Sequence, residues 1–245
     1  MGLLSNEGIA RRNLSVFFLI DISGSMMGAP IAAVNEAMEK LVPVMKKLDE
    51  DNADAEVSFG ILTFGTTVSW LTPNGPESVA DFEWTDVNVD GLTSLGAAFK
   101  DLNSKLSTNA FMKAASASLA PVFILISDGV PSDDYEKSLS DLKQNNWFRS
   151  GMKLALAYED GVDRQILEKF TGTNEAIIDI KNAEDLRKVI QFVTVTSSQI
   201  ASKSQVAVTE EVSTDDPSGG GADVAAQVTD DDGNIDVDVD DWGEW

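Results

Sequence analysis

The sequence predicts an α/β protein with a doubly wound, mainly parallel sheet, helices on both faces and one antiparallel edge strand. Two apolar runs, residues 16–20 and 121–126, lead into acidic residues, as buried strands do at the carboxyl edge of a parallel sheet. Segments with helical periodicity separate the strand-like runs, and this alternation is typical of a doubly wound fold. With 245 residues, 43% of them apolar, the chain is long enough for one large domain.

The first half of the chain is expected to supply a long helix and an antiparallel pair of strands. Apolar residues recur at spacings of three and four over residues 31–48, which predicts an amphipathic helix that Pro43 should kink. Alternation over residues 57–61, followed by the apolar run 68–71, predicts two strands joined by a hairpin at the sheet edge. Residues 73–90 are expected to form a loop.

The second half alternates helices with strands. Asp133 and Asp134 are interpreted as the N-terminal cap of the helix that follows them. The expected helices cover residues 97–106, 133–145, 162–170 and 183–200, and the expected strands cover residues 121–126, 152–158 and 176–180.

Polar side chains follow the first strand. Asp21, Ser23 and Ser25 lie at alternate positions, and Gly24 allows a tight turn between the two hydroxyls. One carboxylate and two hydroxyls suit a small hard cation such as Mg²⁺, with Mn²⁺ as an alternative, because these ions prefer oxygen ligands. A metal that prefers thiolate or imidazole ligands is excluded, since the chain has no cysteine and no histidine.

Two further segments add oxygen ligands. Asp128 follows the second apolar run, and residues 91–96 place Thr93 in a loop before an expected helix. With these parts the chain resembles the von Willebrand factor A (vWA) family, whose metal-ion-dependent adhesion site combines D-x-S-x-S with a threonine and an aspartate from two further loops. The resemblance implies a set of five metal ligands: Asp21, Ser23, Ser25, Thr93 and Asp128.

The resemblance covers about residues 13–200. Residues 91–98 and 126–134 are similar to the bacterial TerY-like branch, which is linked with tellurium-resistance and chemical-stress gene clusters. That similarity implies an adaptor or regulatory subunit with protein partners such as a phosphatase and a kinase-like protein encoded nearby. Relatives often carry glycine where this chain has Leu92; the change should stiffen the second loop and leave the Thr93 hydroxyl available.

Charge and composition limit the class of partner. The net charge is −23, which argues against a general affinity for nucleic acid or an anionic membrane. The apolar stretch 14–20 is too short to span a bilayer, and the N-terminus has no charged lead-in of the secretory type. The absence of cysteine fits a reducing compartment, so a cytoplasmic location is expected.

Composition changes near residue 201, which divides the chain into an expected vWA domain (residues 1–200) and a tail (residues 201–245). The tail carries 13 acidic residues and one basic residue, so it is expected to be disordered. An EF-hand loop is not favoured, because Val228 would occupy its first ligand position. Trp242 and Trp245 give the acidic end the character of a short docking peptide.

The expected function is that of a binding module, not of an enzyme. In this family the hydroxyls hold the cation directly and the aspartates often act through water, so the resemblance implies an open position that takes a partner's carboxylate. A fixed cation with an open position is a strong acceptor for such a group. The expected cofactor is therefore Mg²⁺ and the expected partner is a protein.

Two alternatives remain open. A phosphohydrolase of the haloacid-dehalogenase type would use Asp21 as nucleophile and Asp128 as metal ligand, but it needs a second acid where Ser23 stands. No nucleotide-binding P-loop sequence occurs. The other alternative is a structural subunit whose acidic tail makes the partner contact.

Overall fold

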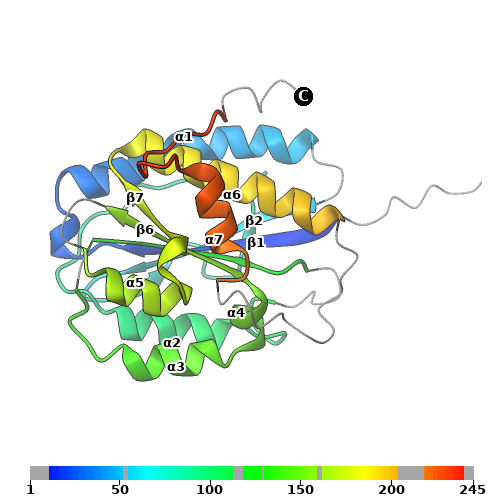
Figure 1. Ribbon diagram of the computed structural model, residues 1–245. Helices are drawn as coiled ribbons and strands as arrows, with labels where there is room; N and C mark the ends of the chain where they lie inside the picture. The colour runs from blue at the N-terminus through cyan, green and yellow to red at the C-terminus, as the bar shows by residue number, and fades with distance from the viewer. Residues whose placement is uncertain are drawn as a thin grey trace, which may run out of the picture.

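The computed structural model describes residues 11–51, 55–112, 118–128, 130–158, 162–203 and 218–239, and confirms the predicted fold class (Figure 1). β1 (Arg12–Asp21) lies at the middle of the sheet, parallel to β2 (Ala55–Phe64) on one side and β5 (Val122–Ser127) on the other. β6 (Met152–Tyr158) and β7 (Ile177–Ile180) continue the parallel sheet beyond β5. Asp21 and Ser127 therefore end neighbouring strands at the same edge of the sheet.

The opposite margin of the sheet is antiparallel, as predicted, but two short strands share it. β3 (Val68–Trp70) pairs with residues 62–64 of β2, and β4 (Glu77–Ser78) pairs with residues 58–59. The second of these strands falls within the segment that was expected to be a loop.

Helices cover both faces of the sheet (Figure 1). One layer is formed by α1 (Ala29–Asp51), α6 (Ala183–Lys203) and α7 (Gly221–Val228). The other is formed by α2 (Leu95–Lys105), α3 (Glu136–Lys143), α4 (Asn146–Ser150) and α5 (Arg164–Thr171). α1 continues through Pro43 as one helix. Two 3₁₀ turns complete the order, η1 (Gly24–Met26) and η3 (Asn174–Ala176).

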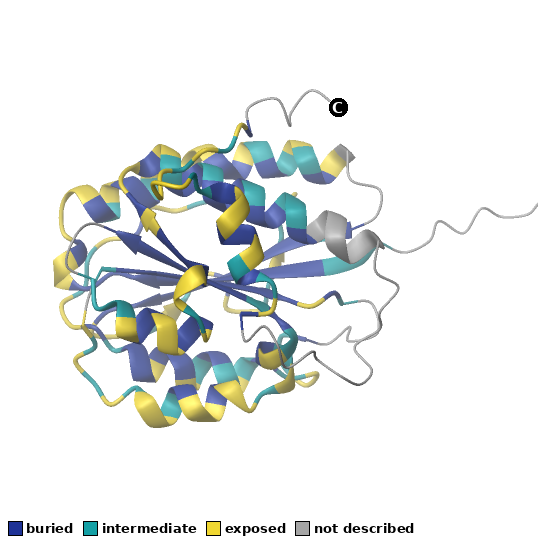
Figure 2. Cartoon of the chain, viewed as in Figure 1, coloured by how far each residue is buried: buried dark blue, intermediate teal, exposed yellow. Residues whose placement is uncertain are grey.

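The central strands are buried on both faces, because each layer of helices has its own apolar core (Figure 2). Successive β1 residues face opposite sides: Phe18 packs in the core beneath α1 and α6, and Phe17 in the core above α2 and α5. This is why the run at 16–20 is continuously apolar instead of alternating. None of the helices found in the described ranges is long and apolar enough to cross a membrane.

The segment 218–239 contradicts the predicted disordered tail. Val224 and Val228, four residues apart on α7, are buried in the core shared with α1 and α6. The amide of Lys153 donates to the carbonyl of Ser218 at 2.8 Å. β7 pairs with β6 only from Ala155 onward, so Ser218 lies beside a part of β6 that β7 does not reach.

The prediction of disorder failed because it was based on the high acidic content of the segment and overlooked the short apolar stripe of α7. The many aspartates of this segment lie in turns and on its exposed side, whereas the spacing of valines and alanines on α7 allows burial. After the turn at residues 230–234, Val239 is buried and its carbonyl accepts a hydrogen bond from Gln191 Nε2 at 3.0 Å. Residues 204–217 and 240–245, with Trp242 and Trp245, lie outside the described residues.

Candidate metal centre

The first loop of the site begins where β1 ends. The carboxylate of Asp21 is fully buried, and its Oδ1 accepts a hydrogen bond from the backbone amide of Ser23 at 2.8 Å. This turn, in which a side chain binds the backbone two residues on, is one that aspartate forms readily. It directs the chain into η1 and leaves Ser23 buried and Ser25 exposed at the edge of the sheet.

Serine hydroxyls link the first loop to the third, which begins at Asp128 after β5. Ser23 Oγ lies 3.0 Å from Ser25 Oγ, and Ser25 Oγ donates to Asp128 Oδ1 at 2.9 Å. On the buried side, Ser127 Oγ donates to Asp21 Oδ2 at 2.7 Å. Two carboxylates from adjacent strand ends and two hydroxyls between them thus form one connected group of oxygen atoms.

The second loop is held against the first through its backbone. The amide of Gly24 donates to the carbonyl of Gly91 at 2.7 Å, and the amide of Asp90 donates to the carbonyl of Ile22 at 2.6 Å. Gly91 has φ +55°, and a Cβ there would lie 2.3 Å from Thr66 Oγ1, so a side chain at this position would strain the backbone and collide with the turn that follows β2.

Thr93 follows in this loop and is buried. Its amide donates to Ser132 Oγ at 3.1 Å, and its carbonyl accepts from the amide of Ser132 at 2.9 Å. Within the described residues no hydrogen bond joins its hydroxyl to the other four predicted ligands. The structure therefore brings Asp21, Ser23, Ser25 and Asp128 into one hydrogen-bonded group and places Thr93 on the loop bonded to Gly24.

Asp133 does not cap the helix that follows it. Its Oδ1 accepts from the amide of Gly96 and its Oδ2 from the amide of Ala97, each at 2.9 Å, so it caps the start of α2 instead. The N-cap residue of α3 is Tyr135, which makes no side-chain capping bond. Asp133 is a helix cap, as predicted, but it caps α2 and not the helix that follows it in sequence. Spacing along the chain cannot show which helix start lies nearby in space.

Burial determines the electrostatics of the group. Loss of water around Asp21 raises the pKa of its carboxyl above the ordinary value, and the charge of Asp128 acts in the same direction. Hydrogen bonds from Ser127 and Ser23 act the opposite way, lowering this pKa. A cation beside the two carboxylates would offset both the desolvation and the repulsion.

The donor set is oxygen only. Among the described residues, no group of three or more acidic, histidine or cysteine side chains gathers to hold a metal. The site instead combines two carboxylates with hydroxyls, which suits a hard divalent cation that keeps some of its water.

Two contributing residues were missed at the sequence level. Ser127 binds the carboxylate of Asp21, and Ser132 binds both backbone groups of Thr93. A serine immediately before Asp128, at the end of an apolar run, was the available signal for Ser127. Nothing in the sequence marks Ser132, since its contact depends on two loops meeting.

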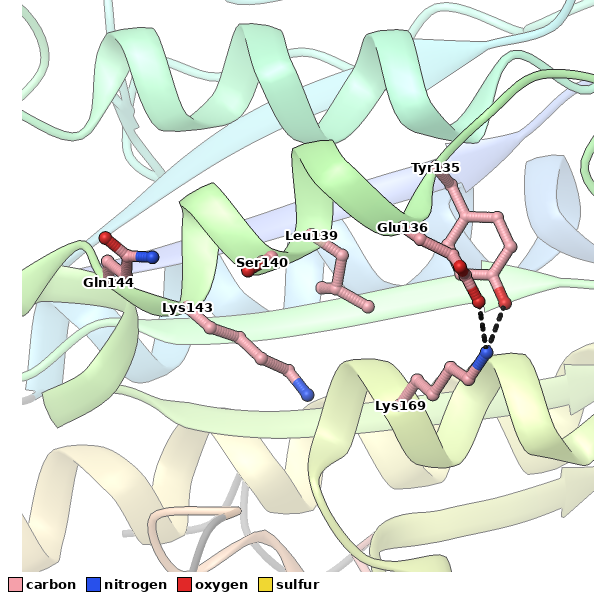
Figure 3. Close-up of a pocket in the computed structure, with 7 residues that line it drawn as sticks. All are labelled: Tyr135, Glu136, Leu139, Ser140, Lys143, Gln144 and Lys169. Carbon is pink, nitrogen blue, oxygen red and sulfur yellow. Dashed lines mark hydrogen bonds and ion pairs between the residues drawn. The ribbon is translucent and has the colours of Figure 1, made fainter.

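Away from the metal centre, a concave region lies between α3 and α5 (Figure 3). There Lys169 Nζ is 2.7 Å from Glu136 Oε1 and 3.1 Å from Tyr135 Oη, and these partners raise the lysine pKa. Burial, followed by the charge of Lys169, lowers the pKa of Lys143. The groove is open to solvent and both of its lysines are exposed, so it offers no enclosed binding site.

A comparison with protein families matches most of this chain. The model of the von Willebrand factor type A domain matches residues 15–194. A search of curated proteins finds no match.

Solved structures share the fold. The pilus adhesin SpaC from Lactobacillus rhamnosus GG has a TM-score of 0.58 at 12% identity, with 78% of this chain and 30% of that chain covered. Proximal thread matrix protein 1 from the mussel byssus, with a zinc-occupied MIDAS motif, has a TM-score of 0.52 at 16% identity, covering 75% and 47%.

A von Willebrand factor type A protein from Catenulispora acidiphila has a TM-score of 0.50 at 16% identity, covering 83% of this chain and 44% of that one. The chain thus spans less than half the length of each of these structures. At such identities the likeness shows the fold alone.

Proposed function

Because this chain belongs to the von Willebrand factor type A domain family, we propose that it is a metal-dependent protein interaction module. The observation that carries the proposal is the connected group of oxygens from Asp21, Ser23, Ser25 and Asp128 at adjacent strand ends. The cation it would hold is Mg²⁺, with Mn²⁺ as an alternative, and the mussel protein with a zinc-occupied MIDAS motif supports a divalent ion at this place in the fold.

The hydrogen bonds suggest how the ligands divide their roles. Each carboxylate oxygen of Asp21 already accepts a hydrogen bond, from the Ser23 amide and from Ser127 Oγ, so Asp21 is suited to act through a water molecule. The hydroxyls of Ser23, Ser25 and Thr93 would contact the ion directly. Hydroxyl ligands carry no formal charge, so the bound cation would still attract a carboxylate from a partner.

Metal binding is tested by thermal unfolding in Mg²⁺ and in EDTA. A ligand that binds only the folded state at one hundred times its Kd adds about 2.7 kcal/mol to the free energy of unfolding. Asp21→Ala should abolish this gain, whereas Asp134→Asn, an exposed acid near the third loop, should keep it. Equal stabilisation of wild type and Asp21→Ala would contradict the site.

Partner binding is tested by a pull-down from the native host with wild-type and Asp21→Ala bait, in Mg²⁺ and in EDTA. Titration of the partner so identified then measures its affinity for each variant. Ser25→Ala and Thr93→Ala should weaken association strongly without unfolding the protein. Affinity that survives both substitutions and EDTA would make the metal site structural.

A phosphohydrolase role has weaker support. Asp21 is fully buried with both oxygens hydrogen-bonded, and Ser23 stands where that class needs a second acid. We expect no hydrolysis of phosphomonoesters or nucleotides with excess Mg²⁺. Turnover that disappears in Asp21→Asn would overturn the binding-module proposal.

The cellular role is a further part of the proposal. Similarity of residues 91–98 and 126–134 to the TerY-like branch supports an adaptor in a cytoplasmic bacterial stress response, including tellurium resistance. A phosphatase and a kinase-like protein encoded nearby would be its partners. Deletion of the gene should sensitise the host to tellurite, and an Asp21→Ala allele should fail to restore resistance.

A further inference from the structure

Three large apolar side chains stand in water beside the metal centre, one on each of its loops. Met27 is 68% exposed, Leu92 is 59% exposed and Val130 is 64% exposed. Only one other large apolar residue of the described chain is exposed, Leu71, and at 36% it is clearly less so. Single exposed apolar residues are ordinary, but the gathering of these three at one site is not scatter.

Chain geometry places all three close to the proposed ligands. Met27 lies two residues after Ser25, and Val130 lies two residues after Asp128. Two residues span at most about 7.6 Å between Cα atoms. Ser25 and Asp128 are themselves joined by a 2.9 Å hydrogen bond, so each of these two apolar residues lies within two residues of the same contact.

Leu92 joins them from the second loop. It lies between Thr93 and Gly91, whose carbonyl accepts the amide of Gly24 at 2.7 Å. Leu71 is remote by comparison, because its amide binds the carbonyl of Ile61, three residues back along β2 from the strand end at Phe64. That is about 10 Å along a strand.

We propose that Met27, Leu92 and Val130 form an apolar ring that selects a partner segment carrying one Asp or Glu flanked by bulky apolar side chains. The inference rests on the proposed function, since the acidic group would bind the cation. As the segment docks, its flanking side chains would cover the ring and exclude water. Water exclusion also strengthens the attraction between the cation and the partner's carboxylate, because the local dielectric falls.

Charge favours a single acidic group over an acidic cluster. With Asp21 and Asp128 nearby and acting partly through water, one partner carboxylate bound directly would complete the neutralisation of a divalent cation, and a second acid would find no positive charge left. The whole chain carries a charge of −23, so additional acids on the partner would be repelled. Apolar flanks avoid this repulsion and match the surface that the three loops present.

The test uses the full chain and short capped peptides as probes, with binding measured by fluorescence anisotropy in Mg²⁺ and in EDTA. One peptide has a central Asp between leucines, the second has the same Asp between serines, and the third has Asn between leucines. We expect the leucine-flanked Asp peptide to bind at least about tenfold more tightly than the serine-flanked one, which is about 1.4 kcal/mol. This binding should be lost in EDTA and in the Asn peptide.

The ring is tested by a triple variant whose substitutions nearly conserve shape: Met27→Gln, Leu92→Asn and Val130→Thr. The preference for apolar flanks should fall below about threefold in this variant, while Mg²⁺ still raises its melting temperature. Leu71→Asn is the matched control, and it should leave the preference unchanged. Circular dichroism checks that each variant is folded.

The outcomes separate the ring from the metal site. Magnesium-dependent binding that is equal for both Asp peptides, or a preference that persists in the triple variant, overturns the ring and leaves the proposed function standing. Tight binding of the Asn peptide in EDTA overturns the coupling between ring and metal. Absence of both magnesium stabilisation and Asp-dependent binding overturns the proposed function, and the ring with it.

A second copy of the chain is the remaining occupant to test. Sedimentation velocity of the wild type should show a monomer at the assay concentration. A wild-type dimer that dissociates in the triple variant would show that the ring is a self-association surface, and would overturn the proposal of a separate partner.

Discussion

At the scale of single residues, Asp21 carries an electrostatic cost that the proposed cation would offset. Its carboxyl is buried and close to Asp128, and burial is the larger cause of its raised pKa. A carboxylate kept charged in such a place opposes folding unless a cation is bound. If the proposed site holds a cation, Asp21 lowers the stability of the metal-free protein and raises its affinity for the metal.

Replacing Asp21 by Asn is expected to stabilise the metal-free protein at neutral pH. Below the ordinary Asp pKa of 3.8 the carboxyl is protonated in both folded and unfolded states, so it imposes no charge penalty. The penalty develops as pH rises through the raised folded-state pKa and is complete above it. Urea unfolding in EDTA from about pH 4 to pH 7 should show the advantage of Asp21→Asn increasing with pH.

The same variant should respond oppositely to metal. In excess Mg²⁺ the wild type should gain stability and Asp21→Asn should gain little. The stability advantage that Asp21→Asn has in EDTA should therefore shrink or reverse. Asp134→Asn serves as the control, because it removes an exposed charge outside the hydrogen-bonded group. A pH-independent difference between wild type and Asp21→Asn in EDTA would contradict the argument from burial.

Asp49 shows a buried carboxylate used for structure alone. It is 5% exposed, and its Oδ1 accepts from Arg11 Nη2 and from the amide of Val57, each at 2.9 Å. Asp49→Ala should lower the free energy of unfolding by about 2 kcal/mol, because a buried amide loses its acceptor and an arginine loses its anion. Chemical unfolding measures the loss.

The matched control for Asp49 is Glu36→Gln. Glu36 pairs with Lys40 four residues on along α1, but both side chains are more than half exposed. Exposed pairs of this kind add little, so this variant should unfold at the same denaturant concentration as the wild type. Similar losses in the two variants would argue against a special role for the buried contact.

At the scale of elements, the start of α7 is the point where the C-terminal segment meets the sheet. A Cβ on Gly221 would lie 2.1 Å from the carbonyl oxygen of Lys153, so no larger residue fits there unless the helix moves. Gly221→Ala should therefore destabilise the protein by about 1–3 kcal/mol, although alanine is the better helix former. Hydrogen exchange should show reduced protection of the Lys153 amide, which donates to Ser218.

Ala226→Gly separates packing from helix propensity. Ala226 is exposed on the same helix, so this change lowers propensity by about 1 kcal/mol without touching the sheet. It should leave the Lys153 amide protected. If Gly221→Ala instead stabilised the protein, α7 would not be docked as the structure shows.

The elements also show what the sequence could predict. Apolar runs ending in polar residues identified β1 and β5, because a strand buried on both faces is apolar at every position. The docking of α7 gave no such signal, since its stripe is short and follows a highly acidic segment. Asp133 was assigned to the wrong helix for a related reason: its partners, Gly96 and Ala97, are distant in sequence.

For the candidate site, sequence reasoning reached the groups that could touch a metal and missed those that support them. Asp21, Ser23 and Ser25 are spaced within one loop, and the structure joins them to Asp128 through hydrogen bonds. Ser132 supports Thr93 across two loops, which only the fold brings together. The role of all five predicted ligands in metal binding stays a prediction.

At the scale of the whole molecule, net charge should make stability depend on salt. A charge of −23 on one chain opposes compaction through self-repulsion. Raising NaCl from low concentration to about 0.3 M shortens the screening length to below 10 Å, so the melting temperature in EDTA should rise. Choline chloride should act similarly, since screening does not depend on the identity of the cation.

Magnesium should stabilise beyond screening only in proteins with an intact site. At matched ionic strength, Mg²⁺ and NaCl should raise the melting temperature of Asp21→Ala by similar amounts, whereas Mg²⁺ should exceed NaCl in the wild type. A melting temperature that falls as NaCl is added would show that favourable ion pairs, not repulsion, dominate this surface.

The contact between Ser218 and Lys153 also bears on how the chain folds as it is made. β6 lacks its outer neighbour at Lys153 until residue 218 has been synthesised, and 65 residues separate the two. At ribosomal speeds of about 5–20 residues per second, the growing chain keeps this strand edge uncovered for roughly 3–13 s. During that interval the nascent protein offers an open edge to other chains, and translation of the acidic C-terminal segment is what closes it.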